Sequence, residues 1–434
     1  MNSCVLLLHD VPENTEVGID MKFWRVGKNF RGIKDIPLGF HFIYFSAVNA
    51  DCKSGQRTGF VEWFTHPGFV AKRWVAVDED FVDVPLTPSD VQRLTDNYDE
   101  VSLYLGPYPS ECRRGWVALT NLVSPASLSR ILPECGRVYS CTQFLSEPSS
   151  SQQRLALQPA PEVSSKPEDL LPKLQVLPGT EIRFSKIPKN PLFPPNSNPA
   201  EVTAHGIDQT YTLDSVLRVI ADTATNLGAT DVELNQPDSG NSLSLEEREL
   251  LAELQFSYLL NILYFSFPTS TVHVLDGWYQ WRRIVQLLAS CEEAIYRRPQ
   301  LYINLVSVLY HQLCSASKSK EFLEDKTAAV STAELADLFF SETTGPRTNL
   351  AEPAFLPSVL RKLLRNILCT STLDSKGGLL QSLRERAEGF CHSLEQRFHW
   401  GIKPEVLKKE ENAVDVLVDD VDWEGDEAPV IVQL

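Results

Sequence analysis

The residues of this chain that could carry out chemistry do not fall into a recognised spacing. None of the eight histidines forms an HExxH pair or another metal-binding pattern. The sequence contains no Gly-x-Ser-x-Gly elbow, no P-loop and no dinucleotide-binding glycine fingerprint. We therefore expect no catalytic residue, no metal site and no cofactor. A hydrolase whose site is assembled in space is kept as an alternative, because spacing along the chain does not exclude it.

The nine cysteines are odd in number, widely scattered and never paired as CxxC. This pattern favours neither a zinc knuckle nor a disulfide framework, and it is typical of a reducing compartment. The apolar run at residues 4–8 is too short for a secretory signal, and no apolar run approaches the roughly 18 residues of a membrane span. We expect a soluble intracellular protein.

A basic and aromatic stretch near the N-terminus is a candidate RNA-binding surface. Its members are Lys22, Phe23, Trp24, Arg25, Lys28, Phe30, Arg31 and Lys34. A spacing of three on an extended chain sends alternate charges to opposite faces, so no single basic stripe is expected. We favour a solvated sheet edge rich in turns and keep RNA contact as the alternative.

The formal net charge of −17 argues against binding to free nucleic acid over the whole surface, because such binding depends on cationic neutralisation of phosphates. Residues 405–434 alone carry −8 of this charge. Within this tail Val414, Val416 and Val418 alternate with acidic and apolar residues, and residues 428–434 favour a strand. We interpret the end either as a strand that joins a sheet, in this protein or in another, or as a frayed acidic tail.

The first part of the chain is rich in β-branched and aromatic residues. We predict strands at residues 4–8, 23–26, 39–47, 59–64 and 69–77, arranged as an antiparallel sandwich or small barrel. Helical periodicity over 89–105, with Ser89 and Asp90 as the N-cap, predicts a helix that ends at Gly106. Shorter helices are predicted at 116–122 and 127–132.

Beyond Asp208 the periodicity is helical almost throughout. Helices are predicted at residues 245–265, 278–288, 292–296, 301–313, 356–368 and 379–398, forming a bundle or a right-handed array. Trp278 and Trp281 lie at helical spacing and are interpreted as core, with a partner-binding hot spot as the alternative. The predicted fold is α+β. It comprises a mainly-β, sandwich-like domain with a few helices (1–145), a flexible Ser- and Pro-rich linker (146–179), an all-α domain (180–403) and an extended acidic tail (404–434).

Several motifs together resemble the A1-cistron splicing factor family. In the first domain they are Gly18-Ile-Asp20, Trp24-Arg-Val-Gly27, Phe30-Arg-Gly-Ile33, Pro37-Leu-Gly-Phe-His-Phe42, Leu105-Gly-Pro-Tyr-Pro109, Trp116 and Leu119-Thr-Asn-Leu122. Further along they are Gly179-Thr-Glu-Ile-Arg-Phe-Ser185, Glu253-Leu-Gln-Phe256, Trp278, Trp281, Glu292-Glu-Ala294, Leu301-Tyr-Ile-Asn-Leu305, Leu309-Tyr-His-Gln-Leu313 and Ala428-Pro-Val-Ile-Val432. The resemblance covers most of both domains.

The resemblance implies a noncatalytic assembly chaperone of the U5 small nuclear ribonucleoprotein, present in cytoplasm and nucleus. Family members bind the RNase-H-like and MPN-type domains of the large spliceosomal scaffold protein and leave before the activating RNA helicase takes their place. The family's tail adds a strand between the two scaffold domains. The positions carried over to this chain are Pro429, Val430, Ile431 and Val432.

Asp419, Asp420 and Asp422 lie close to that terminal strand. We expect them to face a basic, RNA-facing surface of the scaffold, where their charge would delay engagement of RNA or of the helicase. An RNA-binding splicing component is the alternative within the same process.

Overall fold

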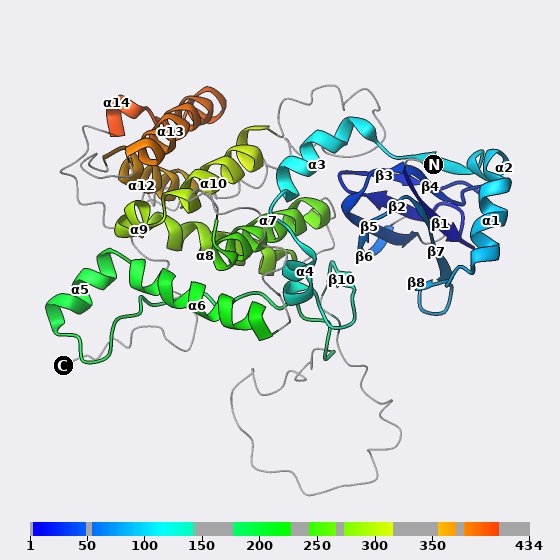
Figure 1. Cartoon of the computed structure of the whole chain (residues 1–434), viewed down its shortest axis with the longest axis horizontal. Helices are drawn as coiled ribbons and strands as arrows, with labels where there is room; N and C mark the ends of the chain where they lie inside the picture. The colour runs from blue at the N-terminus through cyan, green and yellow to red at the C-terminus, as the bar shows by residue number, and fades with distance from the viewer. Residues whose placement is uncertain are drawn as a thin grey trace, which may run out of the picture.

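The computed structural model describes residues 3–48, 54–141, 143, 177–226, 243–265, 273–315, 355–369 and 377–407. Strands lie in the first two of these ranges and gather at one end of the molecule in Figure 1, while the helices from α5 onward form the other end. The predicted α+β organisation, with a β-rich N-terminal domain and a helical part after it, is confirmed.

Within the described ranges, ten strands form two five-stranded sheets. One has the order β8-β7-β1-β4-β9 and the other the order β10-β6-β5-β2-β3. The strands are β1 (Cys4–His9), β2 (Glu16–Ile19), β3 (Lys22–Arg25), β4 (Gly32–Ile36), β5 (Gly39–Val48), β6 (Ser54–Phe64), β7 (Gly68–Val75), β8 (Asp80–Asp83), β9 (Leu105–Pro107) and β10 (Val138–Tyr139). The expected sandwich is present, but it is not purely antiparallel, because β1 pairs in parallel with β7 and β4 with β9.

The centre of the sandwich is strand β1, which is buried on both faces. Cys4, Leu6 and Leu8 face the core between the sheets. Val5 and Leu7 face the opposite side, where helices α1 (Pro88–Asp96) and α2 (Tyr98–Ser102) cover the sheet (Figure 1). This explains the continuous apolar run of β1, because a strand with two covered faces has no polar side to alternate with.

Five strands were not predicted from sequence, and β2 shows why. Its four residues, Glu-Val-Gly-Ile, combine a carboxylate and a glycine that are both poor strand formers. The glycine is required here, because a Cβ at Gly18 would lie 2.3 Å from the ring of Tyr44 on β5. Packing against a neighbouring strand therefore decides the conformation of β2.

The helix predicted over 89–105 is divided in two and begins earlier than expected. Thr87 is the N-cap: its hydroxyl accepts the N–H of Asp90, the Asp90 carboxylate accepts the N–H of Thr87, and Pro88 occupies the first turn. The prediction of Ser89 and Asp90 as the cap was wrong, because proline at the first helical position extends the helix towards the N-terminus. Helix α1 ends at Asp96, and Asn97 separates it from α2.

The remaining described helices are α3 (Arg113–Thr120), α4 (Pro125–Ile131), α5 (Pro199–Ile207), α6 (Thr210–Asn226), α7 (Leu245–Phe265), α8 (His273–Ala289), α9 (Glu292–Arg297), α10 (Pro299–Tyr310), α12 (Phe355–Cys369), α13 (Gly377–Phe398) and α14 (Pro404–Leu407). Most of them follow the predictions, whereas α5, α6 and α14 were given no helical range from sequence. A 3-10 turn, η1 (Ser110–Cys112), precedes α3, and a π-helical turn, η5 (His311–Ser315), continues α10.

Helix α7 is the central helix of the helical part. It packs against α6, α8 and α10, and also against α3 and α4 from the N-terminal domain. Phe40, Phe42 and Tyr44 of sheet strand β5 belong to the same continuous apolar core as the buried residues of α7. The β-rich and helical parts of the chain therefore share one core.

Candidate partner-binding surfaces

The residues predicted to bind a partner lie outside the described part of the chain. They are Pro429, Val430, Ile431, Val432, Asp419, Asp420 and Asp422, whereas the described residues end at Leu407 in α14. Their role stays a prediction. The described residues show what the tail is attached to and which other surfaces are available.

An aspartate and a histidine meet in the interior of the sandwich. Oδ2 of Asp20 lies 2.7 Å from Nδ1 of His41 and accepts the hydroxyl of Tyr108 at 2.7 Å, while Oδ1 accepts the N–H of Phe42 at 3.0 Å. Asp20 has a φ of 55° and is fully buried. Burial raises its pKa, although His41, Tyr108 and the Phe42 N–H all favour the charged carboxylate.

This pair resembles the orienting half of a catalytic triad, but its geometry joins strands. The second ring nitrogen of His41 lies 2.9 Å from the carbonyl oxygen of Pro37, so both nitrogens are engaged by the protein. Burial raises the pKa of the neighbouring Cys112 thiol to about 12, which disfavours a thiolate nucleophile there. The arrangement fixes β2, β5 and the segment after β9 to one another.

The basic and aromatic stretch does not form one surface. Lys22 and Arg25 lie on β3 and Lys34 on β4, in different sheets. Lys22 pairs with Glu111 at 2.9 Å, and Lys34 donates to the carbonyl oxygen of Ser102 at 3.0 Å. The structure agrees with the interpretation of a turn-rich sheet edge.

The tryptophans of α8 are part of the core. Trp281 is fully buried, and its Nε1 donates to Oε1 of Gln312 at 2.9 Å. Trp278 is partly buried and stacks on Trp281, with ring centroids 5.2 Å apart. The interpretation of these residues as core is confirmed.

A buried charged network joins the N-terminal domain to helix α7. Arg130 of α4 is bonded to Glu249 at 3.2 Å and to Glu253 at 2.7 Å, and all three side chains are at most 5% exposed. Ser127 donates to Glu249 at 2.6 Å. Ser185, on the segment that enters the helical part, accepts from Arg130 and donates to Glu253. Sequence periodicity marked these carboxylates only as positions on a helix, so the network was not predicted.

A second junction lies at the C-terminal end of α7. The guanidinium carbon of Arg57 on β6 lies over the rings of Phe23 and Tyr44, 4.8 Å from each ring centroid. The same side chain donates to the carbonyl oxygen of Leu263 in the last turn of α7. A cation at this place also interacts favourably with the helix dipole. The two junctions hold α7 near both of its ends.

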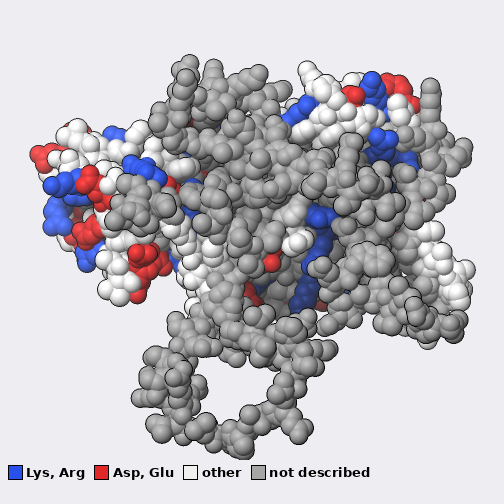
Figure 2. All heavy atoms as spheres, turned by 180° about the vertical axis from the view of Figure 1, so that it is seen from behind, with Lys and Arg blue, Asp and Glu red and all other residues white. Residues whose placement is uncertain are grey.

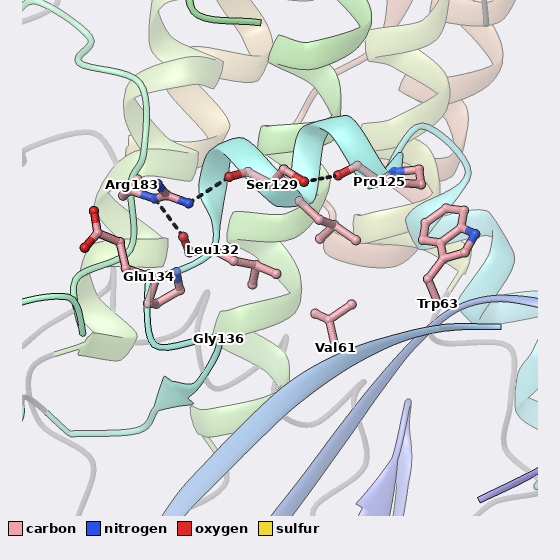
Figure 3. A pocket seen from close by; sticks show the side chains of 10 residues that line it. Val61, Trp63, Pro125, Ser129, Leu132, Glu134, Gly136 and Arg183 are labelled. Atoms are coloured by element: carbon pink, nitrogen blue, oxygen red, sulfur yellow. Dashed lines mark hydrogen bonds between the residues drawn. The ribbon is translucent and has the colours of Figure 1, made fainter. Parts of the chain in front are cut away.

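An open groove lies beside the first junction, between β6 and α4 (Figure 3). Val61 and Trp63 of β6 form one side, and Leu128 of α4 and Leu132, the C-cap of α4, form the other. Its volume is about 490 Å³, and Pro125, Ser129, Pro133, Glu134, Gly136 and Arg183 complete the lining. Arg183 donates to the carbonyl oxygens of Leu132 and Ser129, and so satisfies the end of α4.

At the left edge of the face in Figure 2, Lys and Arg side chains are mixed with Asp and Glu side chains. Within the ranges that the structure describes, no group of three His, Cys, Asp or Glu side chains is placed to hold a metal ion. In those ranges no helix combines the length and apolarity that crossing a membrane requires.

Comparison with known proteins matches both parts of the chain. A family model described as the AAR2 N-terminal domain matches residues 2–133, and one described as the AAR2 C-terminal repeat region matches residues 184–403. The chain belongs to the AAR2 family. This is the family of A1-cistron splicing factors that the sequence motifs resemble, and membership makes the protein a splicing-related factor.

Relatives called "Protein AAR2 homolog" match along most of their length. The one from Macaca fascicularis is 30% identical over 409 residues, which is 92% of this chain and 90% of that protein. The one from Homo sapiens is 29% identical over 92% of this chain and 90% of that protein. The one from Caenorhabditis elegans is 26% identical over 72% of this chain and 79% of that protein.

The AAR2 motifs coincide with the buried contacts described above. Asp20, His41 and Tyr108 come from three different motifs and meet in the sandwich. Ser185 and Glu253 come from two more and meet at the first junction. The motif residues thus hold strands and domains together, and the groove between β6 and α4 is largely made by residues outside the motifs.

Proposed function

We propose that the protein is a noncatalytic assembly factor of the U5 small nuclear ribonucleoprotein. It binds the C-terminal RNase-H-like and MPN-type domains of the large spliceosomal scaffold protein and blocks premature engagement of the spliceosomal RNA helicase. The observation that carries this proposal is AAR2 family membership over both parts of the chain. No cofactor is required by the proposal, and cytoplasm and nucleus are its proposed locations.

The shared core supports a role in presenting fixed surfaces. Arg130 of α4 and Arg57 of β6 join the N-terminal domain to α7 at two places, and one apolar core includes residues of both parts. A partner that contacts both parts of such a molecule meets them in one relative orientation and loses less conformational freedom on binding.

The tail supplies the second contact in this proposal. Pro429, Val430, Ile431 and Val432 would add a strand to a sheet edge of the scaffold. Each main-chain hydrogen bond contributes about 0.5–1.5 kcal/mol net, which is offset by an ordering cost of about 1–2 kcal/mol per residue. The strand therefore needs the folded part of the chain to hold it nearby at high effective concentration.

Direct RNA binding is the less favoured function. Lys22 and Lys34, at the two ends of the basic stretch, lie in different sheets, and each is engaged within the protein. A surface that binds single strands needs a continuous cationic groove with accessible aromatic rings.

Purification of the tagged full-length protein tests the proposal. We expect recovery of the scaffold protein without the helicase, and reduced recovery when residues 428–434 are deleted. Recovery of neither spliceosomal protein would contradict the assembly function. Equal recovery by the shortened protein would contradict the docking mode of the tail and leave the assembly function standing.

A further inference from the structure

As far as the described residues show, strand β6 has an open edge beside the groove of Figure 3. Strand β10 pairs with β6 only at Thr58 and Gly59. On its other side β6 pairs with β5 as far as Phe64. Val61 and Trp63, which form one wall of the groove, therefore lie on the part of β6 that extends beyond β10.

The ladder decides which way the main-chain groups of this part point. Phe42 of β5 lies opposite Val61. Both main-chain groups of Phe42 are used on the other side, where its carbonyl oxygen accepts the N–H of Asp20 at 2.8 Å and its N–H donates to the Asp20 carboxylate. Phe42 and Val61 are thus a pair without mutual hydrogen bonds. Val61, and Trp63 two residues further, direct their N–H and C=O groups away from β5.

In the part of β6 that pairs with β10, the main-chain groups of alternate residues also point away from β5. The carbonyl oxygen of Arg57 accepts the N–H of Ser140 at 2.8 Å. The main-chain groups that point away from β5 belong to residues 57, 59, 61 and 63, which alternate with those that bond to β5. Strand β10 lies beside the first two of these residues and ends before the other two. Among the described residues, β10 pairs with neither Val61 nor Trp63, and no main-chain hydrogen bond from outside the sheet ladders reaches them.

We propose that this edge and groove bind an extended peptide of a partner protein, which adds a strand to β6 in continuation of β10. Main-chain bonds would form with Val61 and Trp63. Alternate apolar side chains of the peptide would contact Val61, Trp63, Leu128 and Leu132. This inference does not rest on the proposed function, in which the present chain supplies a strand and does not receive one.

The charges at the groove favour a basic end on the peptide. Glu134 lines the groove, and no described cation forms an ion pair with it. Arg183 is the groove's cation, and its guanidinium already donates to two carbonyl oxygens. A Lys or Arg of the peptide would complement Glu134. The acidic tail of this chain, with net charge −8 over residues 405–434, is a poorer occupant for the same reason.

The test uses the full-length protein and a library of labelled nine-residue peptides. Val, Ile or Leu occupies alternate positions in each peptide, Thr or Ser lies between, and Lys or Glu stands at one end. We expect the Lys-ended members to bind more tightly by fluorescence anisotropy, and Glu134→Lys to reverse that preference. Val61→Pro removes an outward N–H without touching the β5 ladder and should weaken binding at least tenfold. Val61→Ala, which keeps the N–H, should weaken it much less.

Hydrogen exchange supplies a readout that needs no substitution. Exchange of the Val61 and Trp63 amides in the unsubstituted protein should slow when a binding peptide is added. As a control, Val117→Arg on the exposed face of α3 should leave both peptide affinity and this protection unchanged. The inference is overturned if no library member binds, if Val61→Pro binds as tightly as Val61→Ala, or if the two amides gain no protection. Binding that tightens tenfold after deletion of residues 408–434 would make the tail the occupant and overturn the assignment to a partner.

Discussion

Arg130 carries the charge on which the junction of the two parts depends. Its guanidinium contacts Glu249 and Glu253 in an interior where all three side chains are at most 5% exposed. Removing one member of a buried ionic group leaves the others uncompensated, which costs about 3–5 kcal/mol. We therefore expect Arg130→Ala to lower the free energy of unfolding by that amount in urea denaturation.

Arg183→Ala is the matched control for this substitution. Arg183 is exposed and donates to two carbonyl oxygens at the end of α4, so we expect a loss of about 1 kcal/mol. Equal losses for the two variants would show that the buried carboxylates tolerate the absence of Arg130.

The buried thiol of Cys112 makes the stability of the protein depend on pH. Burial raises the pKa of its thiol to about 12, so the folded state holds the proton where the unfolded state releases it. The stabilising contribution is complete below the ordinary thiol pKa and is lost as the pH rises through the folded value. We expect the urea midpoint to fall above about pH 9, and to fall less in Cys112→Ser.

Alkylation of the native protein reports the same burial at neutral pH. Cys112 should resist iodoacetamide, whereas the exposed Cys135 should react, with peptide mass spectrometry as the measurement. Rapid labelling of Cys112 would contradict the prediction.

At the scale of the element, Thr87 shows what sequence spacing could and could not supply. The helical period over Val91, Leu94 and Tyr98 predicted a helix correctly, but the N-cap was placed two residues late. The deciding groups are the Thr87 hydroxyl and the Asp90 carboxylate, which satisfy each other's N–H. We expect Thr87→Ala to cost about 0.5–2 kcal/mol of stability, and Ser89→Ala much less. Thermal unfolding of both variants measures this, and equal shifts would restore Ser89 as the cap.

Most long helices were predicted well, and short strands were not. Helix α7 was predicted with the bounds that the structure shows, because its 21 consecutive residues contain no Gly or Pro. Strands β8 and β9 have four and three residues, too few for an alternating pattern to be read. Strand β8 forms by pairing with the adjacent β7, whereas β9 pairs with β4, which is distant in sequence and cannot be found from local periodicity.

Some features of the candidate sites could be predicted from local sequence, and others could not. The core position of Trp281 followed from helical spacing with Ile284 and Leu288. The groove beside α4 could not be predicted, because Val61 and Leu132 come from elements far apart in sequence. The open edge of β6 depends on where β10 ends, and the two residues of β10 are too few to give an alternating pattern.

At the scale of the whole molecule, the shared core predicts cooperative unfolding. Phe40 and Phe42 of β5 belong to one apolar cluster with α7, and Arg57 bonds the end of that helix. We expect the circular dichroism signals of the strand-rich and helical parts to change in one thermal transition. Two resolved transitions would contradict this. After cleavage at a protease site engineered into residues 146–176, the two fragments should still elute together in gel filtration.

The distribution of charge gives a prediction for partner binding. Replacing Asp419, Asp420 and Asp422 by Lys changes the net charge of the chain from −17 to −11 and acts only on the tail. If the tail lies against a basic surface of the scaffold, each reversal removes an attraction of about 0.2–1 kcal/mol and introduces a repulsion. We expect the affinity for the scaffold's RNase-H-like and MPN-type domains to fall about tenfold or more at low salt, with a flatter salt dependence.

The matched control separates the position of the charge from its amount. Asp96, Asp99 and Glu100 are exposed on and beside α1 and α2, at the far side of the sandwich, and their replacement by Lys gives the same net charge. Affinity measured by calorimetry at about 50 and 200 mM salt should be nearly unchanged for this control, because charges farther apart than a Debye length of about 10 Å are screened. An equal loss in both variants would assign the effect to overall charge. An unchanged affinity of the tail variant at both salt concentrations would remove the tail's acidic residues from the binding mechanism and leave the terminal strand to act through its main chain alone.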